Sequence, residues 1–484
     1  MKKQKLITYF DCESDMGRAS FATCLSVSWI TCDVNDDFKI IDNLSGTLNS
    51  KFRYSRPFEV DAMLAHNIPV ADIMKQKLSN GELVDRWDKS FRDLSEKGTI
   101  FAGFNNMNYD NILLNNSLFV NLKFPYITSK QQFDILPAVR ACSVFSPDAL
   151  RYELNAKGNK SFKLQSMIKA NGISTTRAHD SYEDTRVTLL LSKLLKEKSP
   201  DIFNAALALR RKTDVLPKIK KEKIFCWHES FFKTKIYCGT YIGEQIFPGW
   251  YYLYDLRKNP EDILSLNIND LKEEISKSKK WVRTLKANRS PIIMDKKYSM
   301  LDEEYKEIGY SEINKRYKLI EKHREELSHK LRIIDEEKFK DKLDFDQENK
   351  LAEEKIYTLN IKNEERKWMN EFNEDHTKRT KAFSKLSNDI KTLAEMKIFD
   401  NYSKDEFCEI FSLKDYKRVK RRVAEEILDT SNKHSPFTKI PEQQARIDTL
   451  RVIAEKVEDE TKINQLNELD DYLEGMKKDF EQAS

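Results

Sequence analysis

The sequence lacks paired cysteines and long hydrophobic runs. Its seven cysteines form no CxxC pair, which is typical of a protein in a reducing compartment. No stretch is long and apolar enough to span a membrane, and the start MKKQKLITYF has too short an apolar run for a signal peptide. The composition therefore excludes a disulfide-stapled or membrane-embedded protein, and we expect a cytoplasmic one.

Glycine and proline are absent from much of the C-terminal half. No glycine occurs between Gly309 and Gly475, and no proline occurs between Pro291 and Pro436. The stretch 303–396 is dominated by Glu, Lys, Leu and Ile, which predicts long helices, with an antiparallel helical arm as one arrangement. No heptad pattern is sustained over four repeats, so a coiled coil is left as an alternative.

Neither sign of charge is in large excess. The formal net charge is +5 in a chain with 34% charged and 39% hydrophobic residues. Nucleic-acid binding depends on how charges cluster rather than on their total, so this balance permits such a partner without predicting one. A chain of 484 residues is long enough for two to four domains with substantial cores.

The residues from Leu6 to Glu13 form the most informative stretch. Apolar, β-branched and aromatic side chains with no turn residue predict a buried strand that ends on Asp11 and Glu13. Side chains two positions apart on a strand leave on the same face, so these carboxylates should lie side by side. Adjacent anions repel unless a cation separates them, and hard oxygen ligands suit Mg²⁺ or Mn²⁺ better than zinc. A strand that simply runs out into a polar turn is the alternative.

A second α/β unit follows. The stretch 99–104 predicts another short buried strand, which leads into an Asn-rich turn and a helix that begins near Asp110. In such units, sites form at the carboxyl ends of the strands. Further along, the aromatic stretch 225–256 predicts several strands and therefore a β-rich second domain.

Another acid stands at the start of a strongly apolar helix that ends near Leu195. Asp180, with Glu183 three residues on, resembles a capping box at its N-terminus. Asp184 would then lie in the first turn, where the positive end of the helix dipole favours its ionised form. His179 would lie just outside the helix, so the side chains of His179 and Asp184 can face the same site.

Four acids and one histidine thus occupy strand ends or helix starts: Asp11, Glu13, Asp110, Asp184 and His179. Four converging carboxylates can bind two divalent ions about 4 Å apart, which steers attack of water on a phosphodiester. A histidine with a pKa near neutrality suits the general base for that water. Each residue also has a structural alternative: a helix-start acid for Asp110, a dipole partner for Asp184 and a backbone contact for His179.

The order DxE, NxxxYD, HxxxxD resembles the DEDDh exonucleases of the DnaQ-like, RNase H-fold superfamily, most closely the exodeoxyribonuclease I family. The matching motifs are FDCES (10–14), GFNNMNYDN (103–111), FDILPAVRACSVFSPDAL (133–150), SFKLQSMIKANGI (161–173) and AHDSYEDT (178–185). The third and fourth are particular to that family. Weaker matches extend the resemblance over about the first 310 residues, through KIYCGTYIGEQ (235–245) and NRSPII (288–293).

The resemblance implies an α/β RNase H-like exonuclease domain over residues 1–200. It further implies a β-rich SH3-like domain with the start of the helical arm over 201–355, and an α-helical C-terminal domain over 356–484. These parts would form a C-shaped clamp around a basic groove for single-stranded DNA. The implied activity is 3′ to 5′ hydrolysis to 5′-mononucleotides with two Mg²⁺ ions, for which Mn²⁺ can substitute.

The resemblance also assigns roles to single residues. Asp11, Glu13, Asp110 and Asp184 would be the metal ligands and His179 the general base. Ser14 stands where the family usually has threonine and keeps a hydroxyl near the 3′-terminal nucleotide. Arg140 is a candidate phosphate or partner contact, because a guanidinium can grip phosphate in two places. A helix-surface arginine is the alternative.

Several features depart from the family or stay open. The turn after Glu13 is one residue longer than usual. The basic cluster 417–422 is either a groove wall or a solvated helix face. Tyr251, Tyr252 and Tyr254 either form a base-stacking platform or belong to the core.

The expected partners are single-stranded DNA and the C-terminal tail of single-strand-binding protein, with a monomeric chain and no membrane. The same site acting on RNA or short oligonucleotides is one alternative. The other is a scaffold that binds partners through the charged stretch 312–396.

Overall fold

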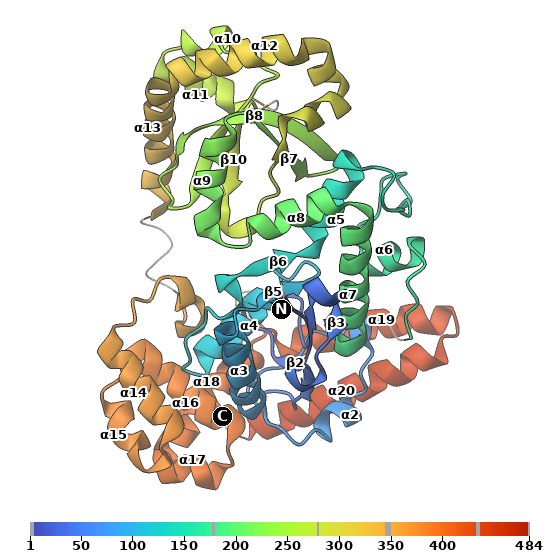
Figure 1. The fold of residues 1–484 in the computed structure, drawn as a ribbon. Coiled ribbons are helices and arrows are strands. Elements are labelled where there is room, and N and C mark those ends of the chain that lie inside the picture. Colours follow the sequence, from blue (N-terminus) through green and yellow to red (C-terminus); the bar gives the residue numbers. More distant parts are fainter. Residues whose placement is uncertain (1–3, 177–179, 278–279, 344–349, 432–435, 483–484) are drawn as a thin grey trace.

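The protein is built in three parts around two sheets. The computed structural model describes residues 4–176, 180–277, 280–343, 350–431 and 436–482. In Figure 1 the first sheet lies near the centre, the second lies above it, and C-terminal helices lie below. The predicted order of an α/β part, a β-rich part and a helical part is confirmed, whereas the boundaries at residues 200 and 355 remain predictions.

The first sheet has six strands in the described part of the chain, in the order β3-β2-β1-β5-β6, with β4 paired to β2. They are β1 (Leu6–Ser14), β2 (Cys24–Asp33), β3 (Lys39–Ile40), β4 (Gly46–Asn49), β5 (Ile100–Gly103) and β6 (Gln132–Asp134). β1 runs antiparallel to β2 but parallel to β5, and β5 runs parallel to β6. The carboxyl ends of β1, β5 and β6 therefore share one edge, where sites of α/β proteins form.

Alternate residues of β1 face different helices. Ile7 and Tyr9 are buried in one core cluster with residues of α5 and α7. Phe10 and Cys12 point the other way, into a cluster with residues of α3 and α4. The helices are α3 (Asn80–Glu96), α4 (Asp110–Val120), α5 (Ile135–Phe145) and α7 (Ser181–Lys198). This period of two is the pattern that predicted the strand, and it sends Asp11 and Glu13 to the α7 side.

The second sheet is antiparallel, in the order β10-β9-β8-β7-β11. Its strands are β7 (Phe225–Ser230), β8 (Thr234–Glu244), β9 (Trp250–Asp255), β10 (Val282–Lys286) and β11 (Met294–Asp295). Tyr251, Tyr252 and Tyr254 on β9 are 6%, 4% and 0% exposed, so the proposed base-stacking platform is wrong. These tyrosines are core residues, because both faces of the sheet are covered.

The helical stretch after the second sheet does not form an antiparallel arm. α12 (Glu303–Lys322) and α13 (Arg324–Leu343) border the second sheet in Figure 1, and Tyr305 and Leu331 are buried in the core cluster that includes Tyr252 and Tyr254. The helices from residue 363 onward pack in a different cluster. The expected arm is therefore wrong, because the apolar residues of this stretch are buried against two different parts of the molecule.

The shorter helices belong to the first two parts, and α8 and α9 lead from the first sheet to the second. They are α1 (Val60–His66), α2 (Val70–Met74), α6 (Leu164–Ala170), α8 (Pro200–Ala208), α9 (Lys212–Glu222), α10 (Glu261–Leu264) and α11 (Ile268–Ser276). The core cluster on the α7 side of the first sheet is continuous with the α12 side of the second. No helix in the ranges described above combines the length and apolar character that crossing a membrane requires.

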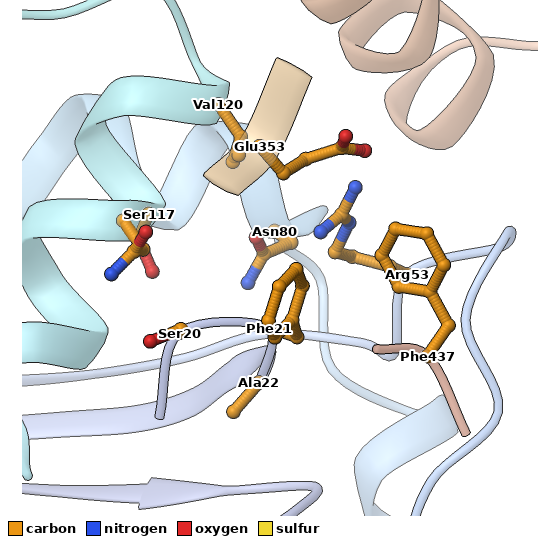
Figure 2. Close-up of a pocket in the computed structure, with 10 residues that line it drawn as sticks. Ser20, Phe21, Ala22, Arg53, Asn80, Ser117, Val120, Glu353 and Phe437 are labelled. Atoms are coloured by element: carbon orange, nitrogen blue, oxygen red, sulfur yellow. The ribbon is translucent and has the colours of Figure 1, made fainter. Parts of the chain in front are cut away.

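The C-terminal helices pack on the first part through a polar and aromatic interface. They are α14 (Asn363–Glu374), α15 (Arg379–Ser384), α16 (Asn388–Asn401), α17 (Lys404–Ile410), α18 (Leu413–Ile427), α19 (Ile440–Lys456) and α20 (Glu460–Glu481). Arg53 forms an ion pair with Asp400 at 2.8 Å. Figure 2 shows Arg53, Glu353 and Phe437 around a cavity of about 10 Å³, which is the size of one water molecule.

The basic cluster 417–422 lies on α18. Arg418 pairs with Glu395 at 2.6 Å, and Lys420 pairs with Asp479 at 2.8 Å. Two of its cations thus hold the C-terminal helices together, which favours a structural role over a groove wall.

Candidate active site

The site is centred on the end of β1. Tyr9, on the same face of the strand as Asp11 and Glu13, shares a buried hydrogen bond of 2.6 Å with Ser192 of α7. The register of β1 against β2 shifts between Glu13 and Ser14, and such bulges re-aim side chains beside functional sites. The strand therefore presents two carboxylates to α7 where regular pairing ends.

The N-terminus of α7 is held in place by hydroxyl groups of β2. The hydroxyl of Ser181 lies 2.6 Å from that of Ser26 and 2.8 Å from that of Ser28. These bonds and the Tyr9 contact hold α7 antiparallel to β1. Asp184, in the first turn of α7, consequently lies over Asp11 and Glu13, and ligand oxygens of the three lie within 4.8 Å of one another.

The helix start at Asp180 is confirmed, but the reciprocal half of a capping box is not formed. The Asp180 carboxylate accepts a hydrogen bond from the Glu183 backbone N–H at 3.0 Å. The Glu183 side chain instead pairs with Arg186 at 2.7 Å, and this contact lowers the pKa of Glu183 to about 2. Glu183 is thereby kept out of the acidic cluster.

Asp110 is the first residue of α4 and adjoins the cluster from the other side of the strand end. Its Oδ1 accepts a hydrogen bond of 3.0 Å from the backbone N–H of Cys12, the residue between Asp11 and Glu13. It is 5% exposed. The structure thus groups three of the four predicted carboxylates within ligand distance and holds the fourth against the same backbone.

The electrostatics of the site are those of crowded, buried anions. Burial raises the pKa of Asp11 well above its usual range, and repulsion from Asp110 and Glu13 adds to the effect. Burial and repulsion from Asp184 raise the pKa of Glu13 to about 9. Burial raises the pKa of Asp110 to about 7, although backbone hydrogen bonds oppose this shift. A divalent cation relieves such crowding, and the all-oxygen donor set fits a hard metal ion.

Two neighbouring residues escaped the sequence analysis. Gln165 of α6 donates a hydrogen bond of 3.1 Å to Oδ1 of Asp184 and thereby orients that carboxylate. The hydroxyl of Tyr109 bonds to both the Ser14 hydroxyl and the carbonyl oxygen of Met16. Gln165 and Tyr109 lie inside the quoted family motifs, which was the only signal available for them.

The remaining predicted site residues are His179 and Arg140. His179 lies outside the described residues, so its role remains a prediction. Arg140 is half-buried on α5, with its guanidinium 5.7 Å from the ring centre of Phe162. Burial and the nearby Arg140 lower the pKa of His228 on β7 to about 4. Arg140 therefore sits near the second sheet, neither among the carboxylates nor fully on a helix surface.

Comparison with known proteins gives partial sequence matches. No protein-family model matches the chain. Exodeoxyribonuclease I of Buchnera aphidicola subsp. Schizaphis graminum is 31% identical over 163 residues, which cover 33% of this chain and 32% of that protein. Exodeoxyribonuclease I of Escherichia coli K12 is 33% identical over 118 residues, which cover 24% of this chain and 25% of that protein. The matched part thus spans about a third or less of these relatives.

Solved structures match over almost the whole chain. Exonuclease I from Methylocaldum szegediense has a TM-score of 0.79 at 19% identity, covering 98% of this chain and 100% of that one. E. coli Exonuclease I with a dA16 oligonucleotide has a TM-score of 0.77 at 18% identity, covering 98% and 100%. A structure described as SSB/Exonuclease I in complex with inhibitor CFAM has the same score, identity and coverage.

The full-length match defines the class of the chain, which has the three-part exonuclease I fold with an acidic cluster at the carboxyl edge of its first sheet. The sequence matches go one step further. They confirm the resemblance to the exodeoxyribonuclease I family.

Proposed function

We propose that this protein is a 3′ to 5′ exodeoxyribonuclease that degrades single-stranded DNA to 5′-mononucleotides. The observation that carries the proposal is the group of carboxylates Asp11, Glu13 and Asp184, whose oxygens lie within 4.8 Å of one another beside Asp110. Buried acids this close are stable as anions only with cations between them. Similarity to exodeoxyribonuclease I, and the E. coli Exonuclease I structure with a dA16 oligonucleotide, support DNA as the substrate.

Each residue has a role in the proposed reaction. Two bound Mg²⁺ ions, for which Mn²⁺ can substitute, would lower the pKa of the attacking water and stabilise the leaving 3′ oxygen. Asp11, Glu13, Asp110 and Asp184 would hold them. His179 would accept the proton of the water as its oxygen bonds to phosphorus, and the bond from phosphorus to the 3′ oxygen would break.

Further groups would position the strand. Ser14 and Tyr109, which bond to each other next to Glu13, would contact the 3′-terminal nucleotide. Gln165 would keep Asp184 oriented toward the metal site. Arg140 would contact phosphate or a protein partner.

The proposal extends to the setting of the enzyme. We place the exonuclease domain at residues 1–200, the SH3-like domain at 201–355 and the helical domain at 356–484. The chain would act as a cytoplasmic monomer. It would bind the C-terminal tail of single-strand-binding protein, a proposal that the SSB/Exonuclease I structure supports.

The test follows a 5′-labelled DNA strand with a free 3′ end, with Mg²⁺ or EDTA. Asp11→Ala should lower the rate by about 100-fold or more, because a ligand of the charge-stabilising group is lost. Asp36→Ala removes an exposed aspartate, with 66% of its side chain accessible, and should leave the rate unchanged.

Three results would contradict parts of the proposal. A strand left intact by the wild type with Mg²⁺ would refute the exonuclease. A ladder that survives Asp11→Ala would show that the site lies elsewhere. Faster decay of an RNA strand of matched sequence would make the enzyme an exoribonuclease instead, because sugar discrimination depends on contacts to the 2′ position.

A further inference from the structure

An open pocket lies between the loop that follows α4 and the first residues of the C-terminal part. Its volume is about 240 Å³. Its lining includes Leu122, Phe124, Tyr126, Tyr357, Arg366 and Met369. The pocket therefore lies where the end of α4 meets η6 (Ala352–Tyr357), and residues of α14 complete its lining.

Three aromatic rings in the lining lie close together, and two of them are open to solvent. Tyr357 is 62% exposed and Phe124 is 40% exposed. The ring centre of Tyr126 lies 5.6 Å from that of Phe124 and 6.4 Å from that of Tyr357. Exposed aromatic side chains in a concave site offer flat faces to a planar ligand.

The pocket also carries a cation. The guanidinium of Arg366 lies 5.1 Å from the ring centre of Phe124, and Arg366 is exposed. Within the described ranges no acid forms an ion pair with Arg366, whereas Lys123 is paired with Asp85 at 3.0 Å. Its charge is thus available to an anionic ligand, and an arginine over an aromatic ring is a common feature of nucleic-acid sites.

α4 separates the acidic cluster from the pocket, and the turn before α4 is held by the second part. Arg289, on the second part, donates a hydrogen bond of 2.7 Å to Oδ1 of Asn108, the neighbour of Tyr109. α4 starts at Asp110 and ends beside the pocket. Its 11 residues therefore separate the acidic cluster from the pocket by about 15 Å.

We propose that this pocket binds an unpaired base of the DNA strand, about four nucleotides from the 3′ end. Bases about 3.4 Å apart along a strand cover the 15 Å of α4 in four to five steps. Stacking on Phe124 and Tyr357 would be independent of sequence, and Arg366 would face the adjacent phosphate. The proposal rests on the exonuclease activity proposed above and assigns a second point of contact to its substrate.

The first experiment compares long and short substrates. Tyr357→Ala and Phe124→Ala should each raise KM about 5- to 150-fold for a 12-nucleotide strand, and leave a dinucleotide too short to reach the pocket unaffected. Tyr357→Phe, which keeps the ring, should behave as the wild type. Phe231→Ala removes a 92% exposed phenylalanine in the turn between β7 and β8 and should change KM for neither substrate. Equal effects on both lengths, or none, would overturn the subsite.

A second experiment separates this subsite from the activity itself. Strands that carry 5-iodouracil at one position are irradiated with the wild-type protein in EDTA, so that no hydrolysis is needed. Cross-links from the fifth or sixth nucleotide, counted from the 3′ end, should map to peptides that contain Phe124 or Tyr357. Such cross-links without any hydrolysis in Mg²⁺ would refute the exonuclease but keep the subsite. Hydrolysis without these cross-links would keep the exonuclease and refute the subsite, leaving the pocket for another ligand such as a peptide.

Discussion

Replacing Glu13 by glutamine should stabilise the metal-free protein while abolishing its proposed activity. Glu13 lies at the end of β1, within ligand distance of Asp11 and Asp184. Burial and repulsion from Asp184 raise its pKa from 4.5 to about 9. A glutamine keeps the shape of the side chain but removes the charge that the folded state must either neutralise or pair with a metal ion.

The size and the sign of the effect follow from this pKa. The folded state holds a proton on Glu13 that the unfolded chain releases above pH 4.5. The destabilisation of the folded state by Glu13 therefore grows as pH rises from 4.5 to about 9. Each pH unit adds about 1.4 kcal/mol, which gives about 3 kcal/mol at pH 7 and below about 1 kcal/mol at pH 5. Glu13→Gln should recover much of this difference at pH 7 and little at pH 5.

Urea unfolding in EDTA measures the effect, with the exposed Glu96→Gln on α3 as the matched control. The midpoint of Glu13→Gln should exceed that of the wild type at pH 7, and the gain should shrink toward pH 5. In excess Mg²⁺ the order should reverse, because the metal stabilises the folded wild type by mass action. A lower midpoint for Glu13→Gln in EDTA at pH 7, or a gain that does not depend on pH, would refute the reasoning.

Two further predictions concern the C-terminal interface. Arg56 is 3% exposed and pairs with Glu353, so Arg56→Met should cost about 3–5 kcal/mol in urea unfolding, whereas Arg446→Met at an exposed pair should cost at most about 1 kcal/mol. Similar losses for both would contradict the assigned burial. Burial lowers the pKa of Lys397 to about 8, so the unfolded chain binds more protons between pH 8 and 10.5 and stability from this group should rise over that range. Lys397→Met should remove that rise in unfolding midpoints, and an unchanged rise would refute the lowered pKa.

Local patterns were sufficient where a structure depends on neighbours in sequence. The β1 strand, with carboxylates at alternate positions, follows from the period of two, and the start of α7 at Asp180 follows from capping chemistry. The strand at 99–104 and the helix at Asp110 were predicted for the same reason. These segments carry three of the predicted ligands and the start of the helix that supplies the fourth.

The packing partners of the helices and strands depend instead on long-range contacts. A composition rich in Glu, Lys and Leu predicts helices after residue 303 but not their partners, and α12 covers the second sheet instead of extending as an arm. Alternation along β9 could not tell whether a second layer covers Tyr252 and Tyr254. In both cases burial depends on residues distant in sequence.

The sequence by itself determined which residue types stand at the strand ends and helix starts, because caps and periodicity act over a few residues. Only the tertiary structure brought Asp184 to within ligand distance of Asp11, through the Tyr9 to Ser192 bond across 183 positions. It also placed Gln165 on Asp184 and opened the aromatic pocket beside α4. Such contacts arise from the docking of whole helices on the sheet, which no local pattern encodes.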